Sequence, residues 1–477
     1  MKTNGNKLKV LFAASEALPF ASTGGLADVM GSLPAALIKE NIDARVVMPL
    51  YDIINEKYKN SFEFICAATV KLSWRNLYCG IYKTTYNGVI FYFIDNEYYF
   101  KKPFLYGSFD DGERFAFFSK AVLDIMPHTD FFPDILNTND WQSALAVIYL
   151  KQYYKNTVKY RDIKAVHTIH NIEYQGEYEL SLMEDVFDIS INDAYIVEYQ
   201  GKLNLTKGAV VCCDKLTTVS PNYAEEIKTE TFSHGLHYVL NSCGDKITGI
   251  LNGIDTDRYK PTAFDKSDLS GKAALKENLQ KKLAMSERPD VPLISMITRL
   301  VPHKGIDLVI RIIDELLAQD IQFIILGTGD ADYENFFKIL EYRHYDKARS
   351  IIKYDKELAD VIYSASDIFL MPSKSEPCGL AQMIASQYGT IPLVRETGGL
   401  YDSIKKYDPV TGEGNGFTFK NYNAHEMLFS LKDAIKLYSA DKDKWRKLMI
   451  QAMETDFSWN ASAKKYIDLY KDLLNGN

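Results

Sequence analysis

Short apolar runs alternate with amphipathic helical patterns along most of this 477-residue chain. Helical patterns cover residues 26–40 and 113–125, each between two apolar runs. In the first half of the chain, the runs that indicate buried strands are 10–14, 45–48, 89–94, 134–136, 166–169 and 215–219. Strand, helix and strand in succession form a βαβ unit, so the pattern predicts a parallel sheet with right-handed crossovers.

A second series of strands begins after a polar, lysine-rich stretch at 265–292, in which no strand is evident. Its members are 293–297, 323–326, 351–352, 368–371 and 391–394. We therefore expect an α/β chain with two Rossmann-like domains, residues 1–250 and residues 251–455. An amphipathic helix at 460–474 ends the pattern, and we expect residues 456–477 to return to the first domain.

The tetrapeptide Thr-Gly-Gly-Leu occurs once in each predicted domain. The two copies are Thr23, Gly24, Gly25 and Leu26, and Thr397, Gly398, Gly399 and Leu400. Each follows a predicted buried strand and opens a predicted helix. A glycine pair there lets the backbone approach a ligand, with N–H groups and the helix dipole directed at negative charge. Two copies predict domains that face a shared anionic ligand across a central cleft, as in a sugar-nucleotide transferase.

Composition narrows the range of partners and cofactors. The formal net charge of −8 argues against a nucleic-acid partner, because phosphate-backbone binders present a basic face. The six cysteines form no Cys-x-x-Cys pair, and Asp330-Ala-Asp332 is a lone loop-like match, so we expect no metal, cofactor or disulfide. No apolar run approaches the roughly 20 residues that span a bilayer, and the first is too short for a signal peptide. We expect a cytoplasmic protein without a membrane partner.

Two cations follow the strand predicted at 293–297. Arg299 and Lys304 lie in the stretch Thr-Arg-Leu-Val-Pro-His-Lys-Gly, and ligands of open α/β domains bind at strand ends. Two permanent cations across a turn can hold a diphosphate and offset the charge that builds on it as it leaves. The alternative interpretation is a solvated basic turn.

A carboxylate follows the strand predicted at 368–371. Glu376 lies in Ser-Lys-Ser-Glu-Pro-Cys-Gly-Leu, at an expected helix start. Its carboxylate could accept hydrogen bonds from sugar hydroxyls, orient a lysine, or interact with positive charge at an anomeric carbon. We expect the N–H groups of Gly379 and Leu380 to face phosphates and Cys378 to be a small packing residue. The alternative is an acid that only complements the helix dipole.

Three further polar positions of the first domain lie at predicted strand ends or turns. His170 follows the strand at 166–169; its side chain could bind a sugar hydroxyl and its carbonyl could face an anomeric centre. A hydrogen-bonded core histidine is the alternative. Asp140 pairs a carboxylate with the Trp141 ring, which suits sugar recognition. Asn252 lies at the expected hinge, where a turn-forming Asn-Gly is the alternative.

Together these segments resemble the family of bacterial glycogen synthases and plant starch synthases, which are retaining glucosyltransferases. The resemblance covers nearly the whole chain in order, through residues 15–16, 19–20, 23–29, 140–142, 168–171, 252–255, 299–305, 376–380 and 397–400. It implies a GT-B fold with an acceptor-side first domain and a second domain that binds the nucleotide sugar. It also implies metal-independent transfer of glucose from ADP-glucose to the 4-hydroxyl of an α-1,4-glucan, with retention of configuration.

The resemblance implies a role for each matching residue. Arg299 and Lys304 would hold the diphosphate, Glu376 would act in the glucosyl pocket, and Tyr354 would stack against the adenine. The residues that would line the glucose side are His170, Asp140, Asn252 and Asp28. The other substrate-binding positions would be Ser22, Thr23, Gly24, Gly25, Cys378, Gly379, Leu380, Thr397, Gly398 and Gly399. Retention is usually explained by front-face attack, in which the leaving phosphate accepts the proton of the acceptor hydroxyl.

The chain departs from the family pattern at three places. Ser22 stands where the family usually has Lys, Ala381 where Thr or Ser is frequent, and Asn137 where His is usual. A serine hydroxyl does not replace the charge of a lysine near the donor phosphates. A loss of about 2–3 kcal/mol in the transition state would slow turnover roughly 30- to 150-fold. Two alternatives therefore stay open: a related transferase that uses UDP-glucose or another acceptor, and a weakened, glucan-binding paralogue.

Overall fold

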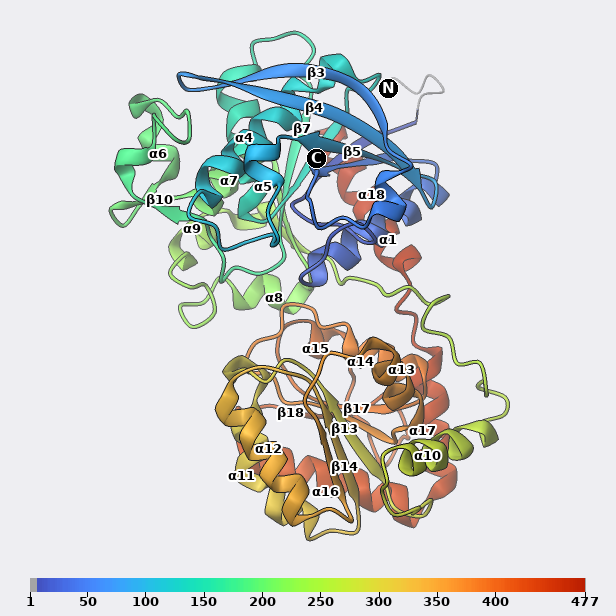
Figure 1. Cartoon of the computed structure of the whole chain (residues 1–477). Coiled ribbons are helices and arrows are strands. Elements are labelled where there is room, and N and C mark those ends of the chain that lie inside the picture. Colours follow the sequence, from blue (N-terminus) through green and yellow to red (C-terminus); the bar gives the residue numbers. More distant parts are fainter. Residues whose placement is uncertain (1–6, 477) are drawn as a thin grey trace. The chain divides into compact units, whose positions relative to one another are not determined.

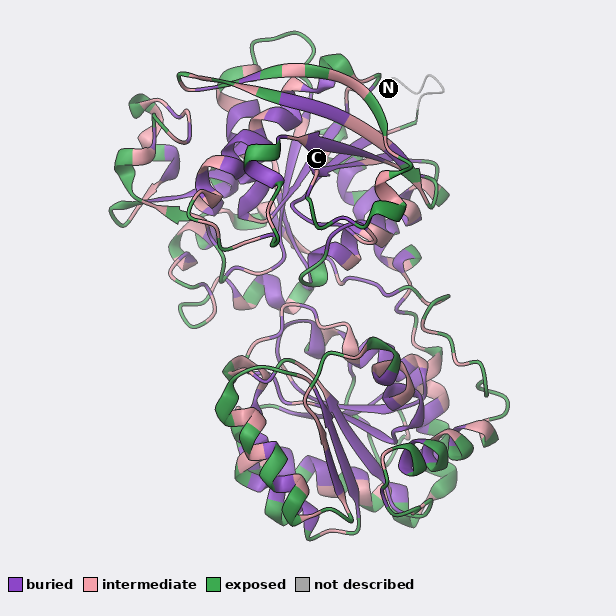
Figure 2. Ribbon diagram, in the orientation of Figure 1, coloured by how far each residue is buried: buried purple, intermediate pink, exposed green. Residues whose placement is uncertain are grey.

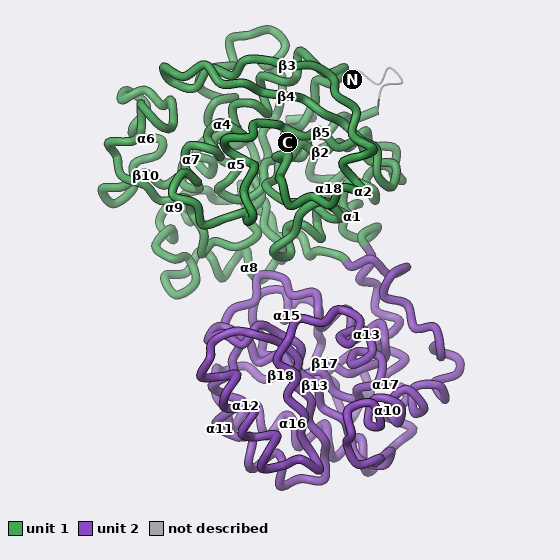
Figure 3. Tube along the Cα trace, in the orientation of Figure 1, with its two compact units in different colours: residues 1–253, 459–477 green, residues 254–458 purple. Residues whose placement is uncertain are grey.

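The computed structural model describes residues 7–476 and divides the chain into two compact units (Figures 1 and 3). Unit 1 comprises Met1–Gly253 with Trp459–Asn477, and unit 2 comprises Ile254–Ser458. The chain thus passes from one unit to the other twice, at 253/254 and at 458/459. Both units are α/β, and no helix within residues 7–476 has the length and apolarity needed to cross a membrane.

Unit 1 is built on a nine-stranded sheet of order β12-β11-β7-β6-β1-β2-β5-β4-β3. From β12 to β5 all neighbours are parallel, which confirms the predicted βαβ organisation. These parallel strands are β1 (Lys9–Ala13), β2 (Asp43–Pro49), β5 (Val89–Asp95), β6 (Ile135–Asn139), β7 (Lys164–Ile169), β11 (Lys215–Thr218) and β12 (Ile247–Gly249). Most of their side chains are buried (Figure 2).

One edge of the unit 1 sheet is antiparallel, and its two strands were not predicted from the sequence. Strands β3 (Glu63–Leu72) and β4 (Arg75–Tyr86) form an antiparallel hairpin, and β4 pairs antiparallel with β5. The turn contains Ser73 in a left-handed conformation, with φ of 53°. A two-residue turn joins antiparallel neighbours without a crossover helix, so no helical pattern separates the two strands. A second, small sheet has the order β8-β10-β9 (Glu177–Tyr178, Lys202–Asn204, Glu198–Tyr199).

The helices of unit 1 are α1 (Gly25–Lys39), α2 (Glu56–Lys59), α3 (Glu97–Phe100), α4 (Asp111–Asp124), α5 (Trp141–Tyr149), α6 (Ala194–Val197), α7 (Leu205–Cys212), α8 (Pro221–Glu226), α9 (His237–Ser242) and α18 (Trp459–Asn475). Several of them begin soon after a strand of the nine-stranded sheet, as α5 does after β6 and α8 does after β11. Ser220 caps α8, because its hydroxyl accepts the N–H of Tyr223 at 3.0 Å.

The last helix, α18, is part of unit 1 and packs along α1. Its Tyr470 hydroxyl donates a hydrogen bond to Oδ1 of Asn137 at 2.8 Å, and Ser462 donates to the carbonyl of Leu251 at 2.6 Å. Tyr470 and Asn137 are both buried. The asparagine that departs from the family pattern therefore anchors helix α18 to the middle of β6.

Unit 2 has a six-stranded, fully parallel sheet of order β15-β14-β13-β16-β17-β18. Its strands are β13 (Leu293–Ile297), β14 (Gln322–Leu326), β15 (Ala348–Ile351), β16 (Ile368–Met371), β17 (Ile391–Arg395) and β18 (Phe417–Phe419). Its helices are α10 (Ser270–Lys282), α11 (Ile306–Leu317), α12 (Ala331–Arg343), α13 (Lys356–Ala365), α14 (Ala381–Gln387), α15 (Gly398–Ser403), α16 (Ala424–Ala440) and α17 (Lys442–Glu454).

The core of unit 2 forms where amphipathic helices meet the buried sheet (Figure 2). Helix α11 buries Val309, Ile312, Ile313 and Leu316, a spacing of three and four residues that places them on one face. The strands are buried on both faces, so their sequences are continuous apolar runs. The sheet is thereby a rigid base for the loops at its carboxyl edge.

Candidate active site

The candidate residues of unit 1 follow strands of its parallel sheet. Residues 14–16 follow β1, Asp140 follows β6 and His170 follows β7, and these three strands are direct neighbours. The carboxyl ends of parallel strands lie at the same sheet edge, which is where α/β proteins bind ligands. Asp140 and His170 are indeed brought together: Oδ1 of Asp140 accepts the backbone N–H of His170 at 2.7 Å.

Asp140 sits at a conformationally unusual position. Its φ is 53°, so a non-glycine residue occupies the left-handed region directly before α5. Burial raises the pKa of its carboxyl to about 7, against the opposing effect of hydrogen bonds from the N–H groups of His170 and Asn171. The carboxyl is therefore partly protonated near neutral pH, and it can then donate as well as accept a hydrogen bond.

The His170 ring is neutral and has a fixed tautomer. Its Nε2 lies 2.9 Å from Oδ1 of Asn139, whose Nδ2 donates to the carbonyl of Ala13, so the histidine proton is on Nε2. Burial lowers the pKa of His170 to about 3. Its Nδ1 is left as an acceptor, suited to a hydroxyl proton. The sequence left open whether His170 is a hydrogen-bonded core residue or a ligand-binding residue. The two roles are compatible, because Nε2 bonds to Asn139 in the core and Nδ1 remains for a ligand.

Glu16 is the residue of unit 1 that the sequence did not single out. It is 3% exposed, and its Oε2 accepts the N–H of Thr23 at 2.6 Å and the Thr23 hydroxyl at 2.8 Å. Burial raises its pKa to about 7; the Thr23 hydrogen bonds oppose this effect, and the charge of Asp28 adds to it. An acid placed directly after a buried apolar run was the available signal. Glu16 holds the loop that carries the first Thr-Gly-Gly-Leu.

That first copy is open. Ser22, Thr23, Gly24 and Gly25 are all exposed, and α1 begins at Gly25. The N–H groups of Gly24 and Gly25 make no hydrogen bond to another residue of the described chain. Nothing lies within 4 Å of where a Cβ on Gly25 would be. These N–H groups at the start of a 15-residue helix fit the predicted approach to an anion.

Asn252 lies on the approach to the first passage between the units. It is 6% exposed, and its Oδ1 is buried without a hydrogen-bond donor among the described residues. Leaving a buried amide oxygen unpaired costs about 1–3 kcal/mol, so this position favours a ligand that donates a hydrogen bond. Asp28 lies in the first turn of α1 and is half-buried.

In unit 2, the half-buried Lys304 and the buried Glu376 form an ion pair. Nζ of Lys304 lies 2.7 Å from Oε2 of Glu376, which also accepts the Ser373 hydroxyl at 2.9 Å. Glu376 is 7% exposed and begins the five-residue loop segment, Glu376 to Leu380, that leads into α14. Of the roles that the sequence left open for Glu376, orienting a lysine is therefore the one observed, and complementing a helix dipole is not.

The turn that carries Lys304 depends on a glycine. Lys304 ends a 3₁₀ turn, η6 (Pro302–Lys304), and Gly305 follows with φ of 74°. A Cβ on Gly305 would lie 2.1 Å from the Pro372 carbonyl oxygen at the end of β16. The missing side chain lets the turn after β13 pack against the loop that contains Glu376.

Arg299 differs from its neighbouring cation. It is exposed, and its side chain makes no hydrogen bond or ion pair with another described residue. It follows β13, which lies beside β16 in the sheet. A cation with no internal partner is available to an anionic ligand, whereas the Lys304 charge is already balanced by Glu376.

The second Thr-Gly-Gly-Leu is packed, and the prediction that its N–H groups point at a ligand is wrong at Gly399. The Gly399 N–H donates to the carbonyls of Glu376 and Pro377, both at 3.1 Å. A Cβ on Gly398, which has φ of 43°, would lie 2.0 Å from the Glu376 carbonyl oxygen, and one on Gly399 would lie 2.2 Å from that of Cys378. Thr397 is fully buried. This copy clamps the Glu376 loop.

The remaining predicted positions of unit 2 lie at the same sheet edge. The N–H groups of Gly379 and Leu380 have no acceptor among the described residues, and Gly379 has φ of 71°. Tyr354 follows β15 and is 87% exposed, as a stacking platform requires. Cys378 is buried; all six cysteines lie among the described residues, and none is in a disulfide.

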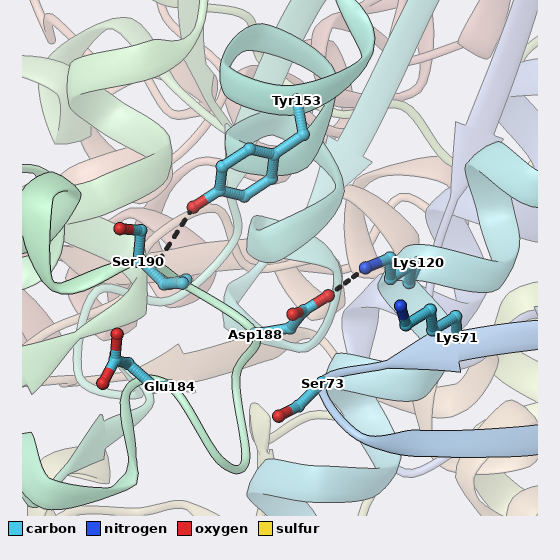
Figure 4. Close-up of a pocket in the computed structure, with 8 residues that line it drawn as sticks. Lys71, Ser73, Lys120, Tyr153, Glu184, Asp188 and Ser190 are labelled. Carbon is cyan, nitrogen blue, oxygen red and sulfur yellow. Dashed lines mark hydrogen bonds and ion pairs between the residues drawn. The ribbon is translucent and has the colours of Figure 1, made fainter.

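Elsewhere the structure shows one polar pocket in unit 1 that contains none of the predicted site residues. Its volume is about 410 Å³, and Figure 4 shows the Lys120–Asp188 ion pair and the hydrogen bond between Tyr153 and Ser190. Its lining residues are Lys71, Ser73, Lys120, Tyr153, Glu184, Asp188, Ile189 and Ser190. Residues 7–476 contain no group of three or more His, Cys, Asp or Glu side chains that could hold a metal ion.

Comparisons with known proteins agree with this arrangement of strands and motifs. A family model described as the starch synthase catalytic domain matches residues 9–242, and one described as glycosyl transferases group 1 matches residues 277–453. A glycogen synthase from Bacillus cereus (strain B4264) is 45% identical over 478 residues, which is 98% of this chain and 100% of that protein. A glycogen synthase from Desulforamulus reducens is 46% identical over 482 residues, with the same coverage.

Solved structures give the same answer for the fold. The catalytic domain of starch synthase IV from Arabidopsis thaliana, bound to ADP and acarbose, is 33% identical with a TM-score of 0.90, and the match covers 98% of this chain and 100% of that one. A sucrose-phosphate synthase from Thermosynechococcus elongatus, 16% identical with a TM-score of 0.61 over 99% of this chain and 100% of that one, is similar in fold alone. The predicted two-domain α/β fold of the GT-B type is confirmed. Because its relatives match it over their whole length, this chain belongs to the glycogen and starch synthase family of retaining glycosyltransferases.

Proposed function

We propose that this protein transfers glucose from ADP-glucose to the non-reducing 4-hydroxyl of an α-1,4-glucan, with retention of configuration. The observation that carries the proposal is a group of charged side chains at the loop edge of unit 2. Arg299, whose side chain is unpaired, and Lys304 both follow β13, and Lys304 forms an ion pair with Glu376, which follows the neighbouring strand β16. The ADP and acarbose bound to the 33% identical starch synthase support this choice of donor and acceptor.

Arg299 and Lys304 hold the diphosphate of the donor. Arg299 has no internal partner, and Lys304 shares its ammonium between Glu376 and the phosphate oxygens. The unpaired N–H groups of Gly379 and Leu380 add neutral donors for the same oxygens. These cations stabilise charge that grows on the diphosphate as the glycosidic bond breaks. The exposed Tyr354 ring stacks on the adenine.

Hydrogen bonds from unit 1 select the glucosyl group. The neutral His170 accepts a sugar hydroxyl at Nδ1, Asn252 accepts one at its unpaired Oδ1, and Asp140 accepts or donates according to its protonation. His170 carries no spare proton near neutral pH, because its pKa is about 3. The proton of the acceptor hydroxyl therefore passes to the departing phosphate, and the glucan oxygen bonds to C1 on the face from which the phosphate leaves.

Transfer of labelled glucose from ADP-glucose into glycogen tests the proposal. We expect incorporation by the wild-type chain and a loss of roughly 10²- to 10³-fold in kcat for Arg299→Ala, by analogy with removal of one electrostatic donor. Lys304→Ala should lose at least as much, because it also leaves the buried Glu376 unpaired.

A donor competition separates the nearest alternative. Equimolar ADP-glucose and UDP-glucose, each with a different label, should give incorporation mainly from ADP-glucose. Preferential incorporation from UDP-glucose would contradict the proposed donor. Incorporation no higher than that of the Arg299→Ala, Lys304→Ala double variant would contradict the synthase activity and favour the glucan-binding alternative.

A further inference from the structure

Arg395, the last residue of β17, binds the loop that leads to Glu376. Its Nε donates to the carbonyl of Ser373 at 2.7 Å, and its Nη2 donates to the carbonyl of Lys374. It is 8% exposed. The planar guanidinium thus engages two successive peptide carbonyls, a pairing that the single ammonium of a lysine does not reproduce.

The two residues that Arg395 holds lead directly to the ion pair. The Ser373 hydroxyl donates to Oε2 of Glu376, the oxygen that faces Lys304. The Lys374 N–H donates to the carbonyl of His303 at 2.9 Å, which fixes the turn that carries Lys304. The contacts of Arg395 therefore reach Glu376 through Ser373, and they reach Lys304 through Lys374 and then His303.

The Glu376 backbone is fixed separately. Its carbonyl accepts the Gly399 N–H at 3.1 Å, so β17 and the start of α15 together hold this glutamate at its backbone and, through Arg395 and Ser373, at its carboxylate. A glutamate that is held both at its backbone and at its carboxylate keeps one side-chain rotamer. Catalytic groups need this fixity, because a misplacement of about 1 Å can cost roughly a hundredfold in rate.

We propose that Arg395 is a positioning residue for glucosyl transfer, which keeps the Glu376 carboxylate and the Lys304 ammonium in the geometry that transfer needs. The inference rests on the proposed function for its effect on rate, but its effect on Lys304 is independent of any activity. Arg395 itself touches no substrate in this scheme.

The direct test is Arg395→Lys, with Arg349→Lys as the matched control. Arg349 is another buried arginine of unit 2, 4% exposed, and it donates to the carbonyls of Leu283 and Ala284, away from the ion pair. We expect Arg395→Lys to lower kcat roughly 10-fold or more, with KM for ADP-glucose changed less than about twofold. Arg349→Lys should lower the melting temperature without this change in kcat. Equal kcat losses in the two variants would overturn the proposal.

A double-mutant cycle asks whether Arg395 acts through Glu376. In a Glu376→Gln background, Arg395→Lys should cost almost nothing further in kcat, because the group that it positions is already lost. Two losses that multiply would mean that Arg395 acts by another route, which contradicts the inference. Ser373→Ala, which removes one hydroxyl and leaves the backbone intact, has the same expectation if Arg395→Lys does not fold.

Chemical labelling of lysines gives a readout that needs no glucosyl transfer. Trace acetic anhydride followed by mass spectrometry reports the reactivity of the Lys304 amine. We expect Lys304 to react several-fold faster in Arg395→Lys than in the wild-type chain or in Arg349→Lys, because its carboxylate partner is no longer held. Unchanged Lys304 reactivity would refute the positioning role. Increased reactivity in a chain that transfers no glucose would refute the proposed function alone.

Discussion

Two carboxyl groups of unit 1, Glu16 and Asp140, have pKa values near 7 in the folded chain, and burial is the main cause for both. The charge of Glu16 also raises the pKa of Asp140, so the two groups sense each other. Glu16 holds Thr23, and Asp140 holds the N–H of His170. The carboxyl groups of Glu16 and Asp140, which hold two loops at one sheet edge, therefore change their protonation across the neutral pH range.

The stability of the protein should depend on pH through Glu16. Its folded pKa of about 7 exceeds the ordinary value of 4.5, so between these values the folded chain binds more protons than the unfolded chain. The free energy of unfolding then falls as pH rises through this window, and the contribution is constant above about pH 7. For Glu16 the shift corresponds to about 3 kcal/mol.

Glu16→Gln removes this titration, so the difference in unfolding free energy between variant and wild type should increase in favour of the variant from pH 5 to pH 8. Urea unfolding at several pH values measures that difference. A difference that is independent of pH would show that Glu16 titrates at its ordinary pKa.

Ser22→Lys tests the clearest departure from the family pattern. Ser22 is exposed, beside the open N–H groups of Gly24 and Gly25, so a lysine fits there without repacking. If a cation at this place is worth about 2 kcal/mol in the transition state, kcat/KM for ADP-glucose rises roughly 30-fold. Ser22→Met adds similar length without charge and should have no such effect. Equal values for the two variants would mean that another basic group already supplies the charge.

At the scale of elements, one tetrapeptide has two structural uses. The first copy starts the long helix α1 with its glycines in open space, and the second packs its glycines against the backbone of another loop. The sequence predicted that both copies bind a ligand. A glycine pair shows that another group can come close to the backbone, but it does not show whether that group is a ligand or another loop of the protein. Only the contacts of Gly399 distinguish a clamp from an anion site.

Alanine substitutions should separate the two uses. Gly399→Ala puts a Cβ 2.2 Å from a backbone oxygen and should destabilise the fold by about 3 kcal/mol, since a backbone segment must move. Gly25→Ala meets no atom within 4 Å and should leave the melting temperature unchanged or slightly higher. Its activity should fall, because a methyl group then covers the open N–H groups. Equal melting temperatures for the two variants would contradict the clamp.

The strands that the sequence predicts are those buried on both faces, such as β13 and β16, since only these give continuous apolar runs. Strand β3 was not predicted, because Val70 and Leu72 are its only fully buried residues and it therefore has no continuous apolar run.

Helix α10 was not predicted for a different reason. Its buried side includes Lys272 and Lys276, whose ammonium groups are satisfied by carbonyl and carboxylate oxygens, so a buried face has a polar composition.

The candidate site also contains residues that a local sequence pattern predicts and residues that it does not. The position of Arg299, Lys304 and Glu376 at the loop edge of unit 2 could be predicted, because these charged residues lie in the segments that follow buried strands. Glu16 and Arg395 act through other residues, and their importance depends on which loops the fold brings beside them. Arg395 is separated from Ser373 by 22 positions, so local pattern does not reveal the contact.

At the scale of the whole molecule, the two units differ in how the chain builds them. Unit 2 is one continuous segment with its own core cluster, whereas unit 1 needs residues from both ends of the chain. Helix α18 buries Trp459, Tyr466, Ile467, Leu469 and Tyr470 within unit 1. Each buried large side chain contributes about 2 kcal/mol.

Separate expression should expose this difference. Residues 254–458 should unfold cooperatively on their own, as followed by circular dichroism. Residues 1–253 lack α18 and leave the buried Oδ1 of Asn137 without its Tyr470 donor, so they should melt well below unit 1 of the intact chain. A segment 1–253 that melts at the temperature of the intact protein would contradict this.

The place of α18 also sets an order of events during synthesis. Translation makes most of unit 1 first, but the helix that packs along α1 leaves the ribosome only after the whole of unit 2. Unit 2 has its whole sequence earlier and can finish folding while its older neighbour still exposes apolar surface. The unit that is begun first is completed last, so a nascent chain cut short before residue 459 retains a complete unit 2 and an unfinished, aggregation-prone unit 1.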